Sequence, residues 1–473
     1  MKILYYNWLQ FDDKRFYGGG VNTYQKNLIE AMIKHENIQV YFLSSGKAYE
    51  KNMMHTYIRK TENIYGNNCE SYEIVNSPIL SSAKLSFFDT RTYLYDKELV
   101  KVFAEFIQIH GGFDVIHFNN FEGLTLGVLR TKEIFPGMKW IYTIHNYYLF
   151  CPEVQLWQHN KCNCTDFDNG RKCIQCGEYT WKWKVKKKHF YKSRSQTQKT
   201  DRKMKCLDML DRIYSNFMEK KIRRQESGYA ELFCEYRRQN ILMFNRYIDV
   251  FLCVSDCVKR IALNMGLEAE KLYTEYIGTK FSDVYTERNV RSSLSDEFTI
   301  IYMGYMNQYK GFYFFLSALE QMEKEQSCKL NIIICAKNTD RTAVDRIKNL
   351  EKKFHKVIYS DGYNHDELPQ LLENVQLGVV PVLWEDNLPQ IAIEMTSYGV
   401  PILTSDLGGA KELSDNDLFV FKAGNTQEFI DRILYFEQHR EMLKEYWKNY
   451  KRPVSLEEHI KRLLVYYEGR ENE

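Results

Sequence analysis

Short apolar runs typical of β-strands alternate with amphipathic helical patterns along most of the chain, and this alternation constrains the fold more than any other feature. One series of strand-like runs ends near Val254, and a second begins at Thr299. A strand–helix–strand order predicts parallel strands joined by right-handed crossovers. Two such series within 473 residues predict two doubly wound α/β domains.

The expected strands are short runs rich in β-branched and aromatic side chains. In the first series they are Lys2–Trp8, Gln39–Leu43, Asp114–Phe118, Lys139–Ile144 and Asp249–Val254. In the second series they are Thr299–Met303, Asn331–Cys335, Leu377–Pro381 and Pro401–Thr404. Examples of the expected helices are Asn22–Lys34, Tyr313–Glu325, Asp340–Phe354, Thr426–Trp447 and a last one that begins with Ser455 as its N-cap.

A polar stretch between Tyr285 and Glu297 separates the two series and marks the expected domain boundary. We therefore assign residues 1–288 to an N-terminal domain, residues 289–450 to a C-terminal domain, and residues 451–473 to a helix that packs back on the N-terminal domain. Residues 151–246 interrupt the alternation. They are expected to form an insert that starts with a cysteine cluster and continues as a basic, mostly helical segment.

The net charge of +3 hides an uneven distribution of charged residues. Residues 182–246 hold 19 lysines and arginines against 7 aspartates and glutamates, so the rest of the chain is net negative. In Lys182–Lys188 the lysines surround Trp183, and Trp181 precedes them. Aromatic and basic residues together suit an anionic membrane surface. They also suit single-stranded nucleic acid, and a solvated helical face is the third interpretation.

Composition and pattern argue against three classes of protein. No run approaches the 18 or so apolar residues of a membrane-spanning helix, and the N-terminal segment lacks the cleavage site of a signal peptide. Only 8 prolines and 24 glycines argue against a disordered chain. We therefore expect a cytoplasmic protein, in which disulfides are disfavoured.

Five of the 12 cysteines fall between Cys151 and Cys176. Four of them have spacings compatible with a tetrahedral zinc site, and they are Cys162, Cys164, Cys173 and Cys176. Cys151 or His159 could replace one of these ligands. The predicted metal would be structural, and a loop with free thiols is the alternative.

Two glycine-rich segments could bind a phosphate. Gly18-Gly19-Gly20 follows the first strand and opens a helix, where backbone amides and the helix dipole favour an anion. Gly304–Gly311 follows the first strand of the second domain, and Lys310 within it could reach a phosphate. A surface loop and a solvated lysine are the alternatives for the two segments.

A third candidate segment, Trp384–Glu394, lies just beyond a predicted strand. Pro389 suits the first turn of a helix, so that unpaired amides near it could face an anion; they are those of Asn387, Leu388, Gln390 and Ile391. Asp386 would precede this helix and Glu394 would project from its second turn. Two carboxylates beside a phosphate site suit the hydroxyls of a sugar nucleotide. A helix cap plus a solvated glutamate is the alternative.

Taken in order, these segments resemble the motifs of the retaining glycosyltransferases of family 4, which have the GT-B fold. The matching segments are Gly18–Gly20, Asp114-Val115-Ile116-His117, Thr143-Ile144-His145-Asn146, Val254-Ser255, Gly304…Lys310-Gly311, Asp386…Glu394, Gly399-Val400-Pro401 and Gly408-Gly409. The resemblance covers most of the chain outside residues 151–246 and is most specific from Trp384 to Gly409. It implies two Rossmann-like domains that face a cleft, with the C-terminal helix crossing back.

The resemblance also implies a role for each matching residue. Glu394 would bind the ribose of a nucleotide-sugar donor, and Asp386 would contact hydroxyls of the transferred sugar. His145 would lie near the anomeric centre, which makes His145, Asp386 and Lys310 the expected catalytic residues. The expected donor-binding residues are Gly19, Gly20, Gly304, Lys310, Asn387, Leu388 and Glu394. The family requires no metal for catalysis.

The chain departs from the family pattern at three points. The usual arginine after Gly304 is Tyr305, so another cation would have to act on the diphosphate; the candidates are Arg15, Lys280 and Lys337. The first carboxylate of the pair is Asp386, which is shorter than the usual glutamate. The adjacent Glu385 is the other candidate for this position. Ile277-Gly278-Thr279-Lys280 replaces the Asn-Gly-x-Asp element, so side-chain contacts cannot be transferred there.

These observations predict a retaining glycosyltransferase of the hexosyltransferase type. It would move a sugar from a nucleotide-diphosphate donor to a glycan or lipid-linked saccharide acceptor, in the synthesis of surface polysaccharide or glycoconjugates. Residues 181–246 would contact an anionic membrane, placing the protein at the inner face of the plasma membrane, and no nucleic-acid partner is expected. The alternative is a zinc-stabilised nucleic-acid-binding protein on a degenerate GT-B scaffold. A GT-B phosphorylase or a nucleotide-sugar epimerase is a third hypothesis.

Overall fold

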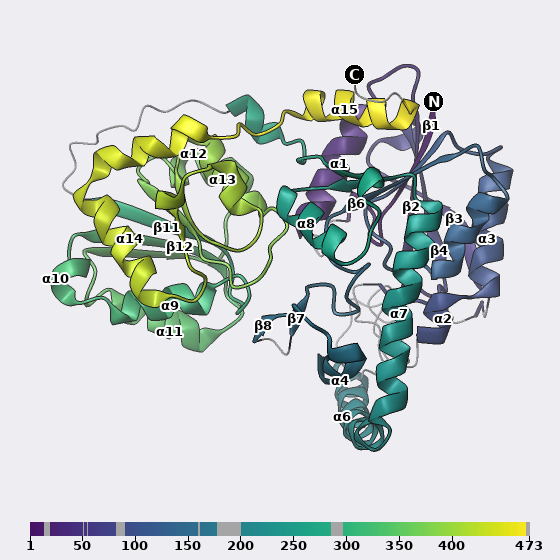
Figure 1. The fold of residues 1–473 in the computed structure, drawn as a ribbon, viewed down its shortest axis with the longest axis horizontal. Helices are drawn as coiled ribbons and strands as arrows, with labels where there is room; N and C mark the ends of the chain where they lie inside the picture. Colours follow the sequence, from purple (N-terminus) through teal and green to yellow (C-terminus); the bar gives the residue numbers. More distant parts are fainter. Residues whose placement is uncertain are drawn as a thin grey trace.

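Two α/β sheets, one from each half of the chain, form the framework of the molecule (Figure 1). The computed structural model describes residues 1–13, 19–50, 52–53, 55–81, 90–158, 161–176, 200–284 and 297–469. Within these residues the first sheet ends with strand β10 and the second begins with β11. The expected joint at residues 285–296 lies outside the described residues, so the exact domain boundaries stay predictions.

The N-terminal sheet has eight strands in the order β10-β9-β6-β5-β1-β2-β4-β3. All neighbours are parallel except β3 and β4. The strands are β1 (Lys2–Tyr6), β2 (Gln39–Ala48), β3 (Tyr57–Thr61), β4 (Cys69–Val75), β5 (Val115–Phe118), β6 (Lys139–Ile144), β9 (Val250–Cys253) and β10 (Leu272–Thr274). The helices of this half outside the insert are α1 (Gly19–Met32), α2 (Thr90–Leu94), α3 (Lys97–Ile109) and α8 (Asp256–Asn264).

The C-terminal sheet has six strands in the order β13-β12-β11-β14-β15-β16, and every pair is parallel. The strands are β11 (Phe298–Tyr305), β12 (Leu330–Lys337), β13 (Lys356–Ser360), β14 (Leu377–Val380), β15 (Ile402–Ser405) and β16 (Val420–Phe421). The helices are α9 (Phe312–Gln321), α10 (Lys324–Ser327), α11 (Arg341–Leu350), α12 (Leu368–Leu371), α13 (Gln390–Ser397) and α14 (Thr426–Gln438).

The predicted class, two doubly wound α/β units, is confirmed, but several element bounds differ and five strands of the two sheets were not predicted. The expected helix Tyr313–Glu325 is two helices, α9 and α10, and Thr426–Trp447 is α14 followed by a 3₁₀ helix, Arg440–Asn449. Strands β3, β10, β13 and β16 lie at sheet edges and were not predicted, and neither was the inner strand β4. Strand β3 is partly exposed and carries Arg59 and Lys60 instead of an apolar run, and β10 and β16 are only three and two residues long.

The C-terminal helix α15 (Leu456–Glu468) crosses from the second sheet to the first and packs on α1, as predicted (Figure 1). It begins directly after Ser455, whose hydroxyl accepts the Glu458 amide at 3.0 Å, so the predicted N-cap is confirmed. Near its end, the Tyr467 hydroxyl lies 2.6 Å from Nδ1 of His117 in β5. Earlier along the helix, His459 Nε2 lies 2.7 Å from the hydroxyl of Tyr24 in α1. Buried polar contacts therefore fix the helix on the N-terminal domain.

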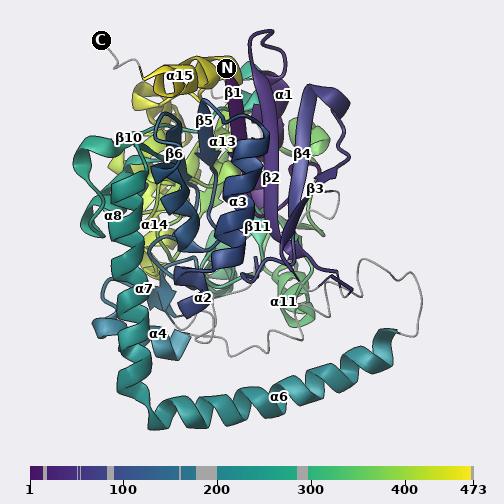
Figure 2. The same cartoon turned by 90° about the vertical axis from the view of Figure 1, so that its right-hand side faces the viewer.

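The insert is described as a small hairpin and three helices. These elements are β7 (Trp157–Gln158), β8 (Cys162–Asn163), α4 (Arg171–Cys176), α6 (Thr200–Arg224) and α7 (Glu226–Tyr247). Helix α7 lies along the N-terminal domain, and α6 extends from its lower end away from the rest of the protein (Figure 2). Among the helices of the described residues, none is both long enough and apolar enough to span a membrane.

Candidate functional site

The two sheets meet where the loop after β14 touches the loops after β6 and β9. Parallel strands present their carboxyl ends at one edge, so these three loops lie at the binding edges of their sheets. The Asn387 side-chain amide donates to the backbone carbonyl of His145, and the Ser255 hydroxyl donates to the carbonyl of Asn387 at 2.6 Å. Three segments of the predicted site are therefore in direct contact across the domains.

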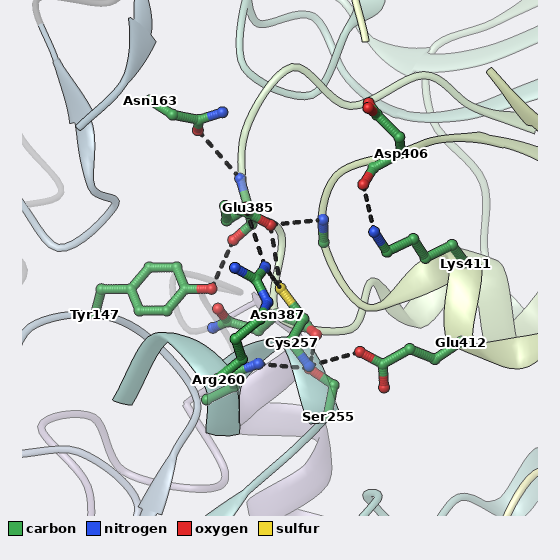
Figure 3. A network of polar contacts seen from close by, with 12 residues as sticks. Tyr147, Asn163, Ser255, Cys257, Arg260, Glu385, Asn387, Asp406, Lys411 and Glu412 are labelled. Carbon is green, nitrogen blue, oxygen red and sulfur yellow. Dashed lines mark hydrogen bonds and ion pairs between the residues drawn. The ribbon is translucent and has the colours of Figure 1, made fainter. Parts of the chain in front are cut away.

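Glu385, the alternative to Asp386 as first carboxylate of the pair, has a structural role at this junction (Figure 3). Its side chain accepts hydrogen bonds from the Gly408 amide (2.9 Å), the Cys257 thiol (3.1 Å) and the Arg260 guanidinium (3.3 Å). Burial acts to raise the pKa of Glu385, but these three donors hold that pKa below its ordinary value. Glu385 is thus an ionised link between the C-terminal domain and α8, with little capacity left for a sugar hydroxyl.

Asp386 faces the opposite way and pairs with Lys310. The Lys310 ammonium lies 2.6 Å from Oδ2 of Asp386 and 5.2 Å from the centre of the Trp384 ring. The aspartate side chain is 8% exposed and that of the lysine 24%. A cation and a carboxylate therefore share one partly buried position after β11 and β14, which suits a ligand that carries both a phosphate and hydroxyl groups.

Two glycines fix the loop that carries Glu385 and Asp386. The Gly409 amide donates to the Asp386 carbonyl at 2.8 Å. Gly408 has φ +74°, and a Cβ on it would lie 2.5 Å from that same carbonyl oxygen. A Cβ on Gly409 would lie 2.3 Å from the Asn387 carbonyl. Backbone packs directly on backbone here, so no larger residue fits without moving the carboxylates.

Glu394 lies in the second turn of α13 and is 1% exposed. The Tyr363 hydroxyl donates to its Oε2 at 2.5 Å, and His365 Nε2 lies 3.3 Å from its Oε1. Burial and then the Glu394 carboxylate raise the pKa of Tyr363, so its hydroxyl stays protonated and donates. Both residues follow β13, which sequence patterns did not identify, so neither was predicted as part of the site.

The His365–Glu394 contact predicts a pH-dependent contribution to stability. The hydrogen bond to Glu394 raises the pKa of His365 against the effect of burial. A raised pKa means that the stabilisation is fully present below the ordinary histidine pKa of about 6.5 and is lost as the pH rises through the raised value. His365→Asn should therefore lower the free energy of unfolding near pH 5.5 and have a smaller effect near pH 9.

Chemical denaturation of the two proteins at several pH values measures this difference. His35→Asn, at an exposed histidine of the N-terminal domain, is the matched control and should leave the pH profile unchanged. A constant effect of His365→Asn across the pH range would show that the ion pair with Glu394 is not formed in solution.

His145 follows β6 at the N-terminal side of the junction. Its Nε2 donates to Oδ1 of Asn119 at 3.1 Å, and its ring centre lies 4.9 Å from that of Tyr24. Burial lowers the pKa of His145 to about 3, with the nearby His459 acting in the same direction. The imidazole is therefore neutral at neutral pH, able to exchange hydrogen bonds but carrying no charge.

Most predicted site residues converge on the junction. Gly19 and Gly20 open α1, and the Gln390 side chain of α13 donates to the Gly20 carbonyl at 3.0 Å, so the glycine turn approaches the start of α13. That helix begins at Gln390, one residue later than the position of Pro389 suggested, and its first amides have no acceptor within the helix. Asn387 and Leu388 are buried just before it, and Gly304 lies in the last part of β11. Gly18 lies outside the described residues.

The proposed substitutes for the diphosphate arginine do not gather at the Lys310–Asp386 pair. Lys280 is 3.0 Å from Glu30 of α1, Lys337 is 3.7 Å from Asp361, and Arg15 lies outside the described residues. Tyr305 is 56% exposed. Arg260, which the sequence did not single out, is the cation that the N-terminal domain brings to the loop.

The cysteine cluster is only partly gathered. Cys151, Cys164, Cys173 and Cys176 line one small cavity, together with Arg237, whose guanidinium donates to Cys173 Sγ at 3.5 Å. Cys162 is exposed in β8. Within the described part of the chain, which excludes His159, no three histidine, cysteine or acidic side chains are placed to hold a metal ion. Structural zinc therefore stays a prediction, which metal analysis of the purified protein would test.

The insert nevertheless reaches the junction through its hairpin. Oδ1 of Asn163 in β8 accepts the Glu385 amide at 3.2 Å, and the Tyr147 hydroxyl donates to the Glu385 carbonyl at 2.8 Å (Figure 3). Asn163 carries no sequence signal for this contact, because its partner lies more than 200 residues away. Asn163, between Cys162 and Cys164, and Tyr147, just before the insert, thus help to hold the loop of Asp386.

Comparisons with known proteins agree with this arrangement. Residues 284–453 match the family model described as glycosyl transferases group 1. No curated protein sequence matches the chain. Among solved structures, Anabaena Alr3699/HepE in complex with UDP has a TM-score of 0.59 and 13% identity over 99% of this chain and 100% of its own.

Two other solved structures show the same architecture over the whole chain. Sucrose-phosphate synthase from Thermosynechococcus elongatus has a TM-score of 0.58 and 13% identity over 99% of this chain and 98% of its own. The lipopolysaccharide outer core galactosyltransferase WaaB has a TM-score of 0.55 and 13% identity over 100% of both chains. Residues 284–453 therefore match the glycosyl transferases group 1 model, and the two sheets together have the GT-B fold of these solved structures.

Proposed function

We propose that the protein is a retaining glycosyltransferase of family 4 that moves a sugar from a nucleotide-diphosphate donor to a glycan or lipid-linked saccharide. The observation that carries the proposal is the junction itself. A group 1 domain places Lys310, Asp386 and Glu394 after the strands of one sheet, and its loop contacts His145 of the other domain through Asn387. The nucleic-acid-binding alternative leaves this assembly unexplained and is not favoured.

The nature of the donor is supported by the chemistry of the residues at the junction and by the structural neighbours. The neighbour from Anabaena has been solved with UDP and with UDP-glucose, which makes uridine diphosphate sugars the first candidates for this chain. Glu394, held by Tyr363 and His365, presents carboxylate oxygens to ribose hydroxyls. Lys310 and the first amides of α13 present positive charge and N–H groups to a diphosphate.

In the proposed reaction, the bond between the sugar C1 and the diphosphate oxygen breaks while the acceptor oxygen bonds to C1 from the same face. The acceptor hydroxyl proton passes to the leaving diphosphate, so no protein nucleophile is required. Lys310 stabilises the negative charge that develops on the leaving group. Neutral His145 and the Asp386 carboxylate orient the donor sugar by hydrogen bonds. Products would serve surface polysaccharide or glycoconjugate synthesis.

A thermal-shift screen of nucleoside diphosphates and their sugars tests the donor, because a ligand that binds the folded state raises the unfolding temperature by mass action. The donor found in this way, incubated with saccharide acceptors, should give a product whose anomeric configuration equals that of the donor by proton NMR. An inverted anomer would contradict retention. The absence of any shift with the whole donor panel would contradict the nucleotide-sugar site.

A further inference from the structure

Helix α6 (Thr200–Arg224) extends from the lower end of α7 and leaves most of its length outside the body of the protein (Figure 2). Its last turns are packed against α4 and α7. Met218 and Ile222 are buried in a small cluster with Cys173 and Ile174 of α4 and with residues of α7. Among the α6 side chains that the structure describes, those from Met209 to Ile213 are exposed, so a partner surface could cover this part of the 25-residue helix.

The free part of α6 carries an exposed apolar stripe. Met209, Ile213 and Phe217 are 66%, 56% and 64% exposed, and their four-residue spacing places them on one face of the helix. Leu210, 45% exposed, widens this stripe. Single exposed apolar residues are ordinary, but a row of large ones on one helix face marks an interaction surface.

Positive charge adjoins the stripe. Lys220 and Lys221 are exposed three and four residues after Phe217, which places them next to it on the helix surface. The sequence of α6 holds eight lysines and arginines against four aspartates and glutamates. The 19 residues before it add eight more basic residues and no acidic one.

The apolar stripe and the positive charge together indicate which kind of partner α6 would bind. The phosphates of a nucleic acid would pair with the positive charge, but a nucleic acid would not bury the apolar side chains of Met209 and Ile213. A second copy of α6 would cover the apolar stripe, but it would bring two positively charged helices together. A bilayer with anionic headgroups meets both, because apolar side chains enter the acyl boundary and lysines contact the phosphates.

We propose that α6 lies in the surface of an anionic phospholipid bilayer, with the Met209–Ile213–Phe217 stripe inserted at the boundary between headgroups and acyl chains. This inference goes beyond the proposed sugar transfer and does not depend on it. The insert that carries α6 also contacts the Glu385 loop through Asn163, so the membrane would lie on the side of the insert.

Sedimentation of the full-length protein with vesicles tests the proposal. The protein should bind vesicles of phosphatidylcholine mixed with phosphatidylglycerol, and added salt should weaken the binding. The double variant Ile213→Ser/Phe217→Ser should lower the partition coefficient about tenfold or more, and Lys220→Gln/Lys221→Gln should weaken binding to the anionic vesicles alone.

The matched control is Ile109→Ser/Ile134→Ser, which removes two isoleucines that are 79% and 63% exposed elsewhere on the N-terminal domain and should leave vesicle binding unchanged. Thermal unfolding checks that every variant keeps its fold. The proposal would be overturned by undiminished binding of the Ile213→Ser/Phe217→Ser variant, or by equal binding to pure phosphatidylcholine. Self-association or nucleic-acid binding that this variant loses, without any vesicle binding by the wild type, would also overturn it.

Discussion

Glu394→Gln should lower kcat/KM for the nucleotide-sugar donor by roughly 10- to 150-fold, mainly through a higher KM. Glutamine keeps the size of the side chain but removes the charge, and a hydrogen bond to a charged group contributes about 1.5–3 kcal/mol. The Glu394 carboxylate is almost fully buried, so no water can replace a ribose hydroxyl at low cost. Initial-rate kinetics over a range of donor concentrations separate KM from kcat.

The control for this prediction removes the neighbour and keeps the carboxylate. Tyr363→Phe eliminates the hydroxyl that donates to Glu394 at 2.5 Å but leaves both carboxylate oxygens for the donor. Its loss in kcat/KM should be clearly smaller than that of Glu394→Gln. An unchanged KM in Glu394→Gln would remove this residue from the donor site, whatever the effect of Tyr363→Phe.

Much of the fold could be predicted because buried parallel strands appear in the sequence as short, largely apolar runs. Lys139–Ile144 was predicted with the bounds that the structure gives, since every residue after Lys139 is buried and most of them are apolar or aromatic. Edge strands such as β3 show no such apolar run, because all five residues are at least partly exposed and include Arg59 and Lys60. The alternation of strands and helices can be identified from local sequence alone, and it was enough to predict the fold class.

The site could be predicted only in its local motifs. The Trp384–Glu394 segment combines turn, helix start and carboxylates in one stretch, so it was visible in the sequence. The choice between Glu385 and Asp386 was not, because it depends on Arg260 and Cys257, which approach from the other domain. Tyr363 and His365 were missed because they follow β13, a strand that was not predicted, and lie about 30 residues before Glu394, so local sequence does not show that they contact it.

Lys310→Met should reduce kcat by about 100- to 1,000-fold, the loss typical of removing one preorganised stabiliser of developing negative charge. Methionine keeps the length of the side chain and its packing on Trp384, but it cannot neutralise the leaving diphosphate. KM for the donor should change less than kcat if the charge acts mainly in the transition state. Single-turnover rates with saturating donor measure the effect on the chemical step.

The same substitution leaves Asp386 without its partner, so stability has to be separated from catalysis. Lys310→Met alone should lower the free energy of unfolding by on the order of 2 kcal/mol, because a mostly buried carboxylate loses its counter-charge. The double variant Lys310→Met/Asp386→Asn removes both charges and should regain most of that stability, yet it should stay inactive. Lys352→Met, at an exposed lysine of the same domain, should change neither property. If the double variant regained activity together with stability, Lys310 would serve only to neutralise Asp386, and the charge on the diphosphate would have to be stabilised by another cation.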